Sequence, residues 1–413
     1  MLRSLNFSFK VWILAAGRLL SGIGSGFTLF YAPIFFVNQV GISSTLVGIA
    51  LGSGSISGVA GRFLGGQWAD SPKWGRRRTL LAATAISVVA DVVLSLTANL
   101  PTLILGNLLM GFGIGMYWPA TEAAIIDLTT AEQLNEAFAV TRLADSLGLS
   151  LGVVLGGALI ANSGSYRALF VIDGISFAVF FGIIYFAIAE TYKFDLQSSE
   201  SKENSWSLAF RDRALMVYVA VSILFTIYLS QVQSTMPLYL KNFVQVGGTT
   251  TVGFSEKVIS GLFTWHIAFA AICQLPVVGL LNRFSRITIL MFSLVLWGIG
   301  FILVWVTGVA ANHTLIWAVL ALGVMSIGMI TYTPIASGLV ADLAPESLRG
   351  VYLSINSQCW AVGYFIGPPL GGWALDHPEL ARYFCLGCAA SILLGIFILQ
   401  YLKLILKTRL SNC

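Results

Sequence analysis

The sequence predicts an all-α membrane protein with twelve transmembrane helices in two pseudo-symmetric six-helix halves. Three observations lead to this fold class. Hydrophobic residues make up 57% of the 413 residues and charged residues only 10%, against about 25% charged residues in ordinary soluble domains. Long apolar stretches recur along the chain, each with the ~20 residues that a membrane helix needs. One set of motifs also occurs twice, about 215 residues apart.

The apolar stretches give the expected helices in chain order. Glycine is frequent within them, as close packing of membrane helices requires. Apolar and polar residues do not alternate with period two, which argues against an outer-membrane barrel. We expect helices at residues 11–36, 44–68, 79–98, 101–126, 138–161, 168–190, 214–235, 258–281, 288–309, 314–341, 350–374 and 381–403.

The duplicated motifs define the two halves. Tyr117-Trp118-Pro119 followed by Asp127 returns as Tyr332-Thr333-Pro334 followed by Asp342, and a spaced glycine series after Gly148 returns after Gly363. A duplicated apolar chain is typical of a transporter with its site between two parallel halves. We expect a first half at residues 1–190, a cytoplasmic linker at 191–213 and a second half at 214–413. Trp206 in the linker belongs to an expected short interfacial helix.

The distribution of positive charge predicts the orientation in the membrane. Most lysines and arginines lie near the two ends, in the linker and in alternate loops, whereas the remaining loops hold few. The positive-inside rule then places both termini and the linker in the cytoplasm. The net charge of +5 therefore reports topology, and we expect no nucleic-acid partner.

No constellation for chemistry is visible. Cys385 and Cys388 have redox or metal-ligand spacing, but they lie inside an expected membrane helix without a nearby histidine. We expect no enzymatic activity, no metal site and no cofactor.

The loop after the second expected helix resembles the signature loop of the major facilitator superfamily, although its spacer between the acid and the next glycine is longer. The resemblance implies that Asp70 acts as a cytoplasmic latch against the helix at 350–374, favouring the outward-open state. It also implies that Asp127 pairs with Arg76 or Arg77. The alternative is that the arginines only anchor topology. The expected latch residues are Gly66, Asp70, Gly75, Arg76, Arg77 and Asp127.

The spaced glycines resemble the antiporter motif of the drug-efflux branch of that superfamily. In the helix at 138–161 the motif has Val153 in place of proline, and the full form with Pro368 lies in the helix at 350–374. We expect a hinge or seal between the halves, or, as the alternative, ordinary helix packing. Its residues are Gly152, Gly156, Gly363, Gly367, Pro368 and Gly371.

Charged residues inside the expected helices concentrate in the first half, where each is a functional hypothesis because burial in a bilayer is costly. Five lie at similar depth and predict one polar cluster for proton coupling: Glu122, Arg142, Asp145, Arg18 and Arg62. Glu122 and Arg142 are expected to pair, with Glu122 as the protonation site. The alternative is a structural ion-pair network. Asp91 and Asp173 lie nearer the opposite membrane face.

The family resemblance implies that the first, fourth, seventh and tenth of the twelve expected helices line a central cavity. Polar and aromatic residues on these helices, or near them, suit an amphiphilic organic substrate. The alternative for each is helix packing with satisfied hydrogen bonds, which is also the more common role of a residue such as His266. The expected cavity residues are Asn107, Tyr228, Gln231, Gln233, Tyr332 and Asn356. Asn107 replaces an arginine that the family uses in proton transfer.

Together these features predict a secondary active transporter. We expect proton-coupled efflux of a small organic compound by alternating access in the bacterial cytoplasmic (inner) membrane, with a monomeric, multi-pass chain whose partners are the substrate, protons and the bilayer. An importer or facilitator is the first alternative, favoured by Asn107 and Val153. A membrane sensor or accessory protein that transports nothing is the second.

Overall fold

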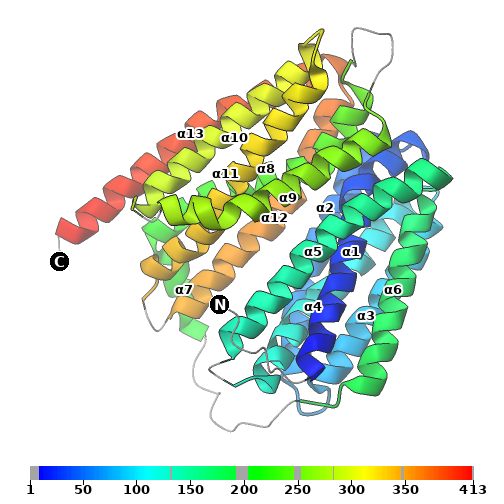
Figure 1. Ribbon diagram of the computed structural model, residues 1–413. Coiled ribbons are helices and arrows are strands. Elements are labelled where there is room, and N and C mark those ends of the chain that lie inside the picture. Colours follow the sequence, from blue (N-terminus) through cyan, green and yellow to red (C-terminus); the bar gives the residue numbers. More distant parts are fainter. Residues whose placement is uncertain are drawn as a thin grey trace. The chain divides into compact units, whose positions relative to one another are not determined.

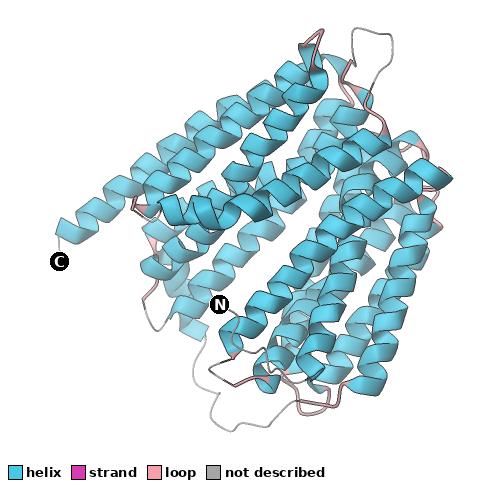
Figure 2. Ribbon diagram, in the orientation of Figure 1, coloured by secondary structure: helices cyan, strands magenta, loops and turns pink. Residues whose placement is uncertain are grey.

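The computed structural model describes residues 9–130, 133–191, 203–245, 253–281, 283–345 and 348–411. Within these ranges the chain is helical, with connecting loops and no β-strand (Figure 2). The chain divides into two compact units, Met1–Ser198 and Ser199–Cys413.

The first unit is a bundle of six long helices. In chain order they are α1 (Phe9–Asn38), α2 (Ser44–Ala69), α3 (Gly75–Ser95), α4 (Leu100–Leu128), α5 (Leu134–Ser163) and α6 (Arg167–Ala187). The closest packing pairs α1 with α5, α2 with α4, α3 with α4 and α3 with α6 (Figure 1). Apart from α3 with α4, these pairings join helices that are not consecutive in the chain.

The second unit begins with a short helix and repeats the six-helix pattern. Its helices are α7 (Glu203–Arg211), α8 (Arg213–Asn242), α9 (Glu256–Leu281), α10 (Arg286–Val309), α11 (Thr314–Leu343), α12 (Arg349–Leu375) and α13 (Pro378–Ser411). Here α8 pairs with α12, α9 with α11, and α10 with α11 and α13. These are the pairings of the first unit when α8 to α13 are matched in order to α1 to α6.

Each expected membrane helix is present, and the predicted fold class is confirmed. Eleven helices in the described part of the chain are long and apolar enough to cross a membrane. The remaining long helix, α12, has the length for a span but carries polar residues such as Asn356 and Gln358. Several helices are longer than expected: α3 begins at Gly75 and α13 continues to Ser411. Their extra turns carry lysine and arginine, which hydropathy alone assigns to loops.

Side-chain oxygens begin several helices by accepting hydrogen bonds from free backbone N–H groups. Asn99 accepts from the N–H of Thr102 at 3.1 Å at the start of α4, and Asp212 accepts from that of Ala214 at 2.8 Å at the start of α8. Gly164 ends α5 in the left-handed conformation with φ of 68°, which favours glycine. These local signals fix where the chain turns between successive spans.

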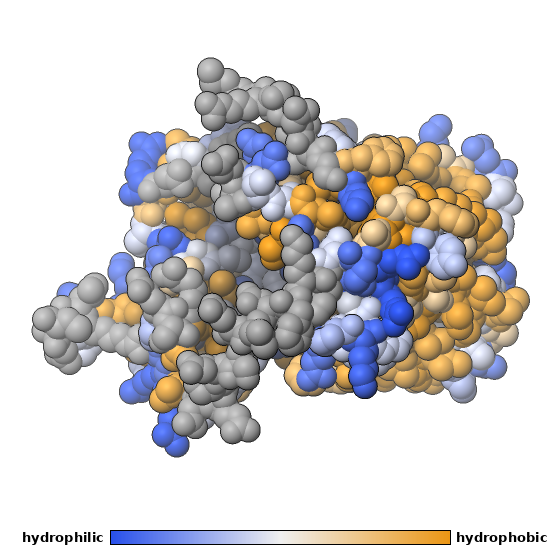
Figure 3. Space-filling view, turned by 90° about the horizontal axis from the view of Figure 1, so that it is seen from below, coloured by the Kyte–Doolittle hydropathy of each residue, from blue (hydrophilic) through white to orange (hydrophobic). Residues whose placement is uncertain are grey.

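The bundle surface carries many large hydrophobic side chains. Phe186 is 88% exposed and Leu393 is 72% exposed, and in an end-on view broad hydrophobic areas lie beside groups of hydrophilic residues (Figure 3). Exposure of this extent is unfavourable in water and favourable against lipid. The protein is therefore a multi-pass membrane protein.

Candidate functional site

A buried ion pair joins α1 to α5 in the first unit. Arg18 on α1 is 2% exposed, and its Nη1 donates to Oδ2 of Asp145 on α5 at 2.9 Å. The guanidinium also lies over the ring of Trp118, 4.4 Å from the ring centroid. Its Nε and Nη2 are buried without a hydrogen-bond partner. One carboxylate and one aromatic ring therefore hold this cation within the membrane region.

The other predicted cluster residues surround this pair. Glu122 and Arg142 are close enough to Asp145 to act on it electrostatically, and Glu122 acts in the same way on Arg62. The structure thus brings together the five charges that the sequence nominated. Their roles stay a prediction.

No ion pair joins Glu122 to Arg142 in the described part of the chain, and Glu122 as the protonation site stays a prediction. Both side chains are exposed at the bundle surface, so the protein does not enclose their charges. Arg18, by contrast, is shielded from water and takes the nearest carboxylate, which is Asp145.

Glycines set the distance between α1 and α5. A Cβ atom at Gly148 or Gly152 would overlap the backbone of α1, and one at Gly22 or Gly26 would approach the backbone of α5 closer than real Cβ atoms do. The two helices therefore meet backbone to backbone. This approach brings Arg18 within reach of Asp145. Beyond the glycines, the hydroxyl of Tyr31 donates to the carbonyl of Val153 at 2.8 Å.

The equivalent glycines in α12 pack against polar side chains of α8. Cβ atoms at Gly363, Gly367 and Gly371 would overlap Thr226, Ser230 and Thr235 in turn. Hydrogen bonds cross the same contact: Gln231 donates to the carbonyl of Gly367 at 2.7 Å, and Thr226 donates to that of Cys359 at 2.9 Å.

In these contacts the glycine strips pack within one half, as in the alternative of ordinary helix packing, and a hinge or seal between the halves stays a prediction. Each strip is filled by a helix of its own half, α1 in the first and α8 in the second. Gly156 lies against the rings of Phe27 and Tyr31, also on α1. Pro368 lies within α12, which continues past it to Leu375.

Most of the cavity residues expected in the second half are buried and bonded within that half. Tyr332 bonds with Ser222 at 2.9 Å, Tyr228 with Ser391 at 2.6 Å, and Asn356 accepts from Tyr218 at 2.6 Å. Gln231 is 1% exposed, and Gln233 accepts from the hydroxyl of Tyr364. These bonds are of the kind expected for helix packing, the alternative for each residue, and a role in a substrate cavity stays a prediction.

Two further polar residues have local partners. The amide of Asn107 donates to the carbonyl of Leu103 on its own helix at 2.9 Å. His266 is 4% exposed and contacts the carbonyl of Leu322 at 3.0 Å and the hydroxyl of Ser326 at 2.7 Å. Neither residue contacts the Arg18–Asp145 pair through these bonds.

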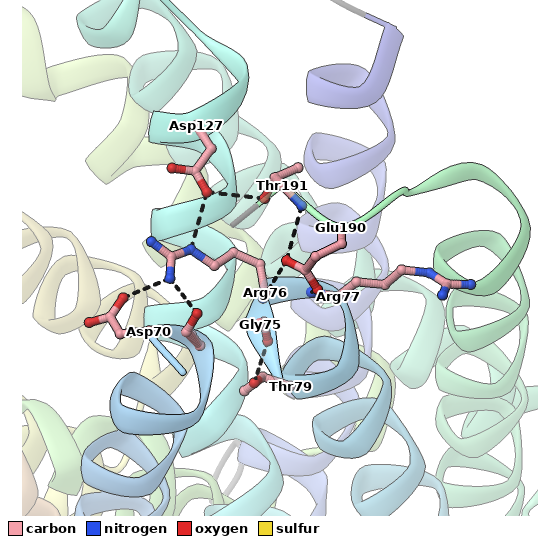
Figure 4. Close-up of polar contacts among 9 residues, drawn as sticks. Asp70, Gly75, Arg76, Arg77, Thr79, Asp127, Glu190 and Thr191 are labelled. Atoms are coloured by element: carbon pink, nitrogen blue, oxygen red, sulfur yellow. Dashed lines mark hydrogen bonds and ion pairs between the residues drawn. The ribbon is translucent and has the colours of Figure 1, made fainter. Parts of the chain in front are cut away.

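The loop between α2 and α3 forms a second polar network, centred on Arg76 (Figure 4). Its guanidinium contacts Asp70 at 2.7 Å and Asp127 of α4 at 3.1 Å, and it also donates to the carbonyl of Ala69. The hydroxyl of Thr191 donates to the same Asp127 oxygen at 3.1 Å. Arg76 is therefore the arginine that pairs with Asp127, one of the two expected, and it ties together the ends of α2, α3 and α4.

Glu190 completes this network and was missed in the sequence. Its carboxylate accepts from the backbone N–H of Arg76 at 2.8 Å and from that of Arg77 at 3.2 Å (Figure 4). The carboxylate lies where a Cβ on Gly75 would stand, and Gly75 has φ of 71°, so both space and conformation favour glycine there. A negative charge at the N-terminus of α3 complements the helix dipole. The signal in the sequence was an acid at the very end of the last apolar stretch of the half.

The second unit retains one bond of this network. Arg286 at the start of α10 pairs with Asp342 of α11 at 3.0 Å, as Arg76 pairs with Asp127. Asn282, which replaces the loop acid in the repeat, lies outside the described residues. The contact of Asp70 with the second half stays a prediction.

Comparison with known proteins identifies the family. The family model described as "Major Facilitator Superfamily" matches residues 14–251 and 246–409. The Na(+), Li(+), K(+)/H(+) antiporter of Planococcus maritimus is 23% identical, with 83% of this chain and 85% of that protein covered. Quinolone resistance protein NorA of Staphylococcus aureus is 22% identical over 92% and 93% of the two chains. The crystal structure of nucleoside transporter NupG has the same fold, with a TM-score of 0.81 at 14% identity, covering 96% of this chain and 99% of that one.

Proposed function

We propose that this chain, which belongs to the major facilitator superfamily, exports a small organic compound across the cytoplasmic membrane in exchange for protons. Membership makes the chain a membrane transport protein that moves small molecules, and it is not an enzyme. The direction of transport, the proton coupling and the inner-membrane location are our proposal, with alternating access as the mode of transport. The chain acts as a monomer with both termini in the cytoplasm, and without a nucleic-acid partner.

The observation that carries the coupling proposal is the Arg18–Asp145 pair. Arg18 is shielded and depends on Asp145 for compensation, whereas Asp145 is partly exposed and open to a proton or a substrate. A proton on Asp145 removes the charge that holds Arg18, so the contact between α1 and α5 weakens. Because breaking a buried pair is costly, the proton changes the relative stability of two arrangements of these helices. This is the property that a coupling site requires.

Other features support export. The antiporter of P. maritimus and the resistance protein of S. aureus are named for proton exchange and drug resistance. An aromatic ring beside a charged pair suits an amphiphilic compound, because the ring of Trp118 lies against the guanidinium that Asp145 binds. The distribution of lysine and arginine supports cytoplasmic termini.

The test is transport in everted membrane vesicles with and without a pH gradient, with a panel of amphiphilic compounds as probes. Wild type should accumulate a substrate only with the gradient. Asp145→Asn should lose gradient-driven accumulation but retain downhill exchange. Glu122→Gln is the matched control, because this acid has no ion-pair partner among the described residues. If Glu122→Gln uncouples transport and Asp145→Asn does not, Glu122 is the protonation site, as the sequence predicts.

Import remains the second candidate. The family's arginine position holds Asn107, whose amide is bonded to its own helix, so one component of the usual coupling route is missing. Gradient-independent uptake of a metabolite into intact cells, with no accumulation in everted vesicles, would favour it. A sensor that transports nothing would bind the compound but show neither uptake into cells nor accumulation in everted vesicles.

A further inference from the structure

Two aspartates lie deep in the first half, outside both networks described above. Asp91 on α3 is 1% exposed and Asp173 on α6 is 2% exposed. Helices α3 and α6 pack against each other (Figure 1). Asp91 lies about 24 Å along α3 from its start at Gly75, at ~1.5 Å per residue. The two acids therefore lie far from the Arg76 network, toward the other end of the half.

Neither aspartate has a partner that compensates its charge. Both oxygens of Asp91 and Oδ1 of Asp173 are buried without a hydrogen bond. No ion pair in the described part of the chain includes either residue. The two carboxyl groups are close enough to interact electrostatically, and Asp91 lies against Gly174, the residue next to Asp173.

A third helix closes the site. The carboxyl group of Asp173 occupies the space where a Cβ on Gly24 of α1 would stand. The glycine thus leaves a recess that holds this carboxyl between α1, α3 and α6. The recess shields the acid from solvent and supplies no base.

The charged residues of the neighbouring helices are engaged or distant. Arg18 of α1 is bonded to Asp145. Arg167, at the start of α6, donates to the carbonyls of Ser95 and, at 2.9 Å, Thr97. Lys10 lies at the start of α1, far along the helix from Gly24. The other charges on α2, α3 and α4, and Asp70 after α2, lie toward the opposite ends of these helices: Arg62, Asp70, Arg76, Arg77, Arg78, Glu122 and Asp127.

Two buried carboxylates that interact electrostatically and have no counter-ion cannot both stay ionised in a membrane interior, because desolvation and mutual repulsion act in the same direction. We propose that Asp91 and Asp173 form a proton-binding site, in which the two carboxyl groups hold at least one proton at neutral pH. The ligand is a proton because hard cations such as Ca²⁺ and Mg²⁺ take six or more oxygen ligands, and no third acid, histidine or cysteine joins the pair in the described residues. The site rests on its own geometry and is independent of the direction of transport.

The direct test is infrared spectroscopy of the full-length protein in lipid at neutral pH, in H₂O and D₂O. Wild type should show the carbonyl band of a protonated carboxyl group that shifts in D₂O. The band should be lost in the double variant Asp91→Asn/Asp173→Asn and changed in frequency in each single variant. Asp70→Asn, which alters an exposed acid, should leave it unchanged. A double variant that keeps the complete band overturns the proposal. Loss of the wild-type band when choline is replaced by Na⁺ also overturns it, in favour of a metal-cation site.

A second measurement tests the proposal even if the double variant folds poorly. The single variants preserve side-chain size, and their thermal unfolding can be followed from acidic to alkaline pH. In wild type, raising the pH removes the shared proton and places two charges together, so the unfolding temperature should fall. Each asparagine variant has one acid fewer, so its fall should be smaller. Equal pH dependence in wild type and both single variants contradicts a shared proton.

Discussion

Removing the carboxylate of Asp145 should destabilise the first half through the charge that it leaves behind. Loss of one partner from a buried ion pair costs about 3–5 kcal/mol. The side chain of Arg18 is 3% accessible and that of Asp145 is 28% accessible, so water reaches one side of the pair. The ring of Trp118 also retains about 0.5–2 kcal/mol of attraction for the cation. We therefore expect Asp145→Ala to lower the free energy of unfolding by about 3 kcal/mol, the lower end of this range.

The assay is a double-mutant cycle on unfolding free energy in mixed micelles, with Arg18→Ala, Asp145→Ala and both together. The double variant has no uncompensated charge, so it should be more stable than the sum of the single losses by about 1–3 kcal/mol. Asp70→Ala and Arg76→Ala form a control cycle at an ion pair whose acid is exposed, where the coupling should be about 0.2–1 kcal/mol. Coupling between Arg18 and Asp145 no larger than in this control would refute the reasoning.

Three further outcomes follow from the contacts. Asp70→Asn should slow turnover and raise cysteine labelling from the cytoplasmic side, with normal expression; unchanged labelling on both faces together with normal transport would leave the loop as a topology anchor. Glu190→Gln should lower stability by about 0.3–1 kcal/mol in thermal unfolding, because it removes the charge at the start of α3; no change in low salt would exclude the dipole contribution. Gly367→Leu should destabilise the contact with Ser230 by at least about 1–3 kcal/mol and reduce transport more than Val153→Leu, while the protein still reaches the membrane; full activity would show that the glycine has no mechanical role.

Apolar length and repetition were sufficient to predict the fold. Each expected span became a helix, because about 20 apolar residues in a bilayer have few alternatives that satisfy the backbone. The expected short helix around Trp206 is also present, as α7. Helix ends were less certain, because arginines in the first turn of α3 and lysines in the last turns of α13 continue helices that hydropathy ends earlier.

The sequence predicted which charged residues lie in the cluster, but not which of them form an ion pair. Depth along each helix located the five charges at a similar level. Depth does not report the direction in which a side chain points, so Glu122 was assigned Arg142 as its partner, whereas the ion pair seen in this cluster joins Arg18 and Asp145. The partner of Glu190 depends on the return of the chain after α6 to the start of α3, which no local pattern contains. Spacing revealed the glycine strips, but their neighbours followed only from the helix pairing.

The two equivalent helix contacts differ in what can open them. Between α1 and α5 the glycines let the two backbones meet directly. Two polar contacts also join these helices, the Arg18–Asp145 ion pair and the Tyr31–Val153 hydrogen bond. Between α8 and α12 hydroxyl and amide groups form bonds along the contact. A change of pH acts on a carboxylate and leaves hydroxyls and amides uncharged. The contact between α1 and α5 therefore contains an acid that a change of pH can neutralise, whereas the bonds named between α8 and α12 contain none.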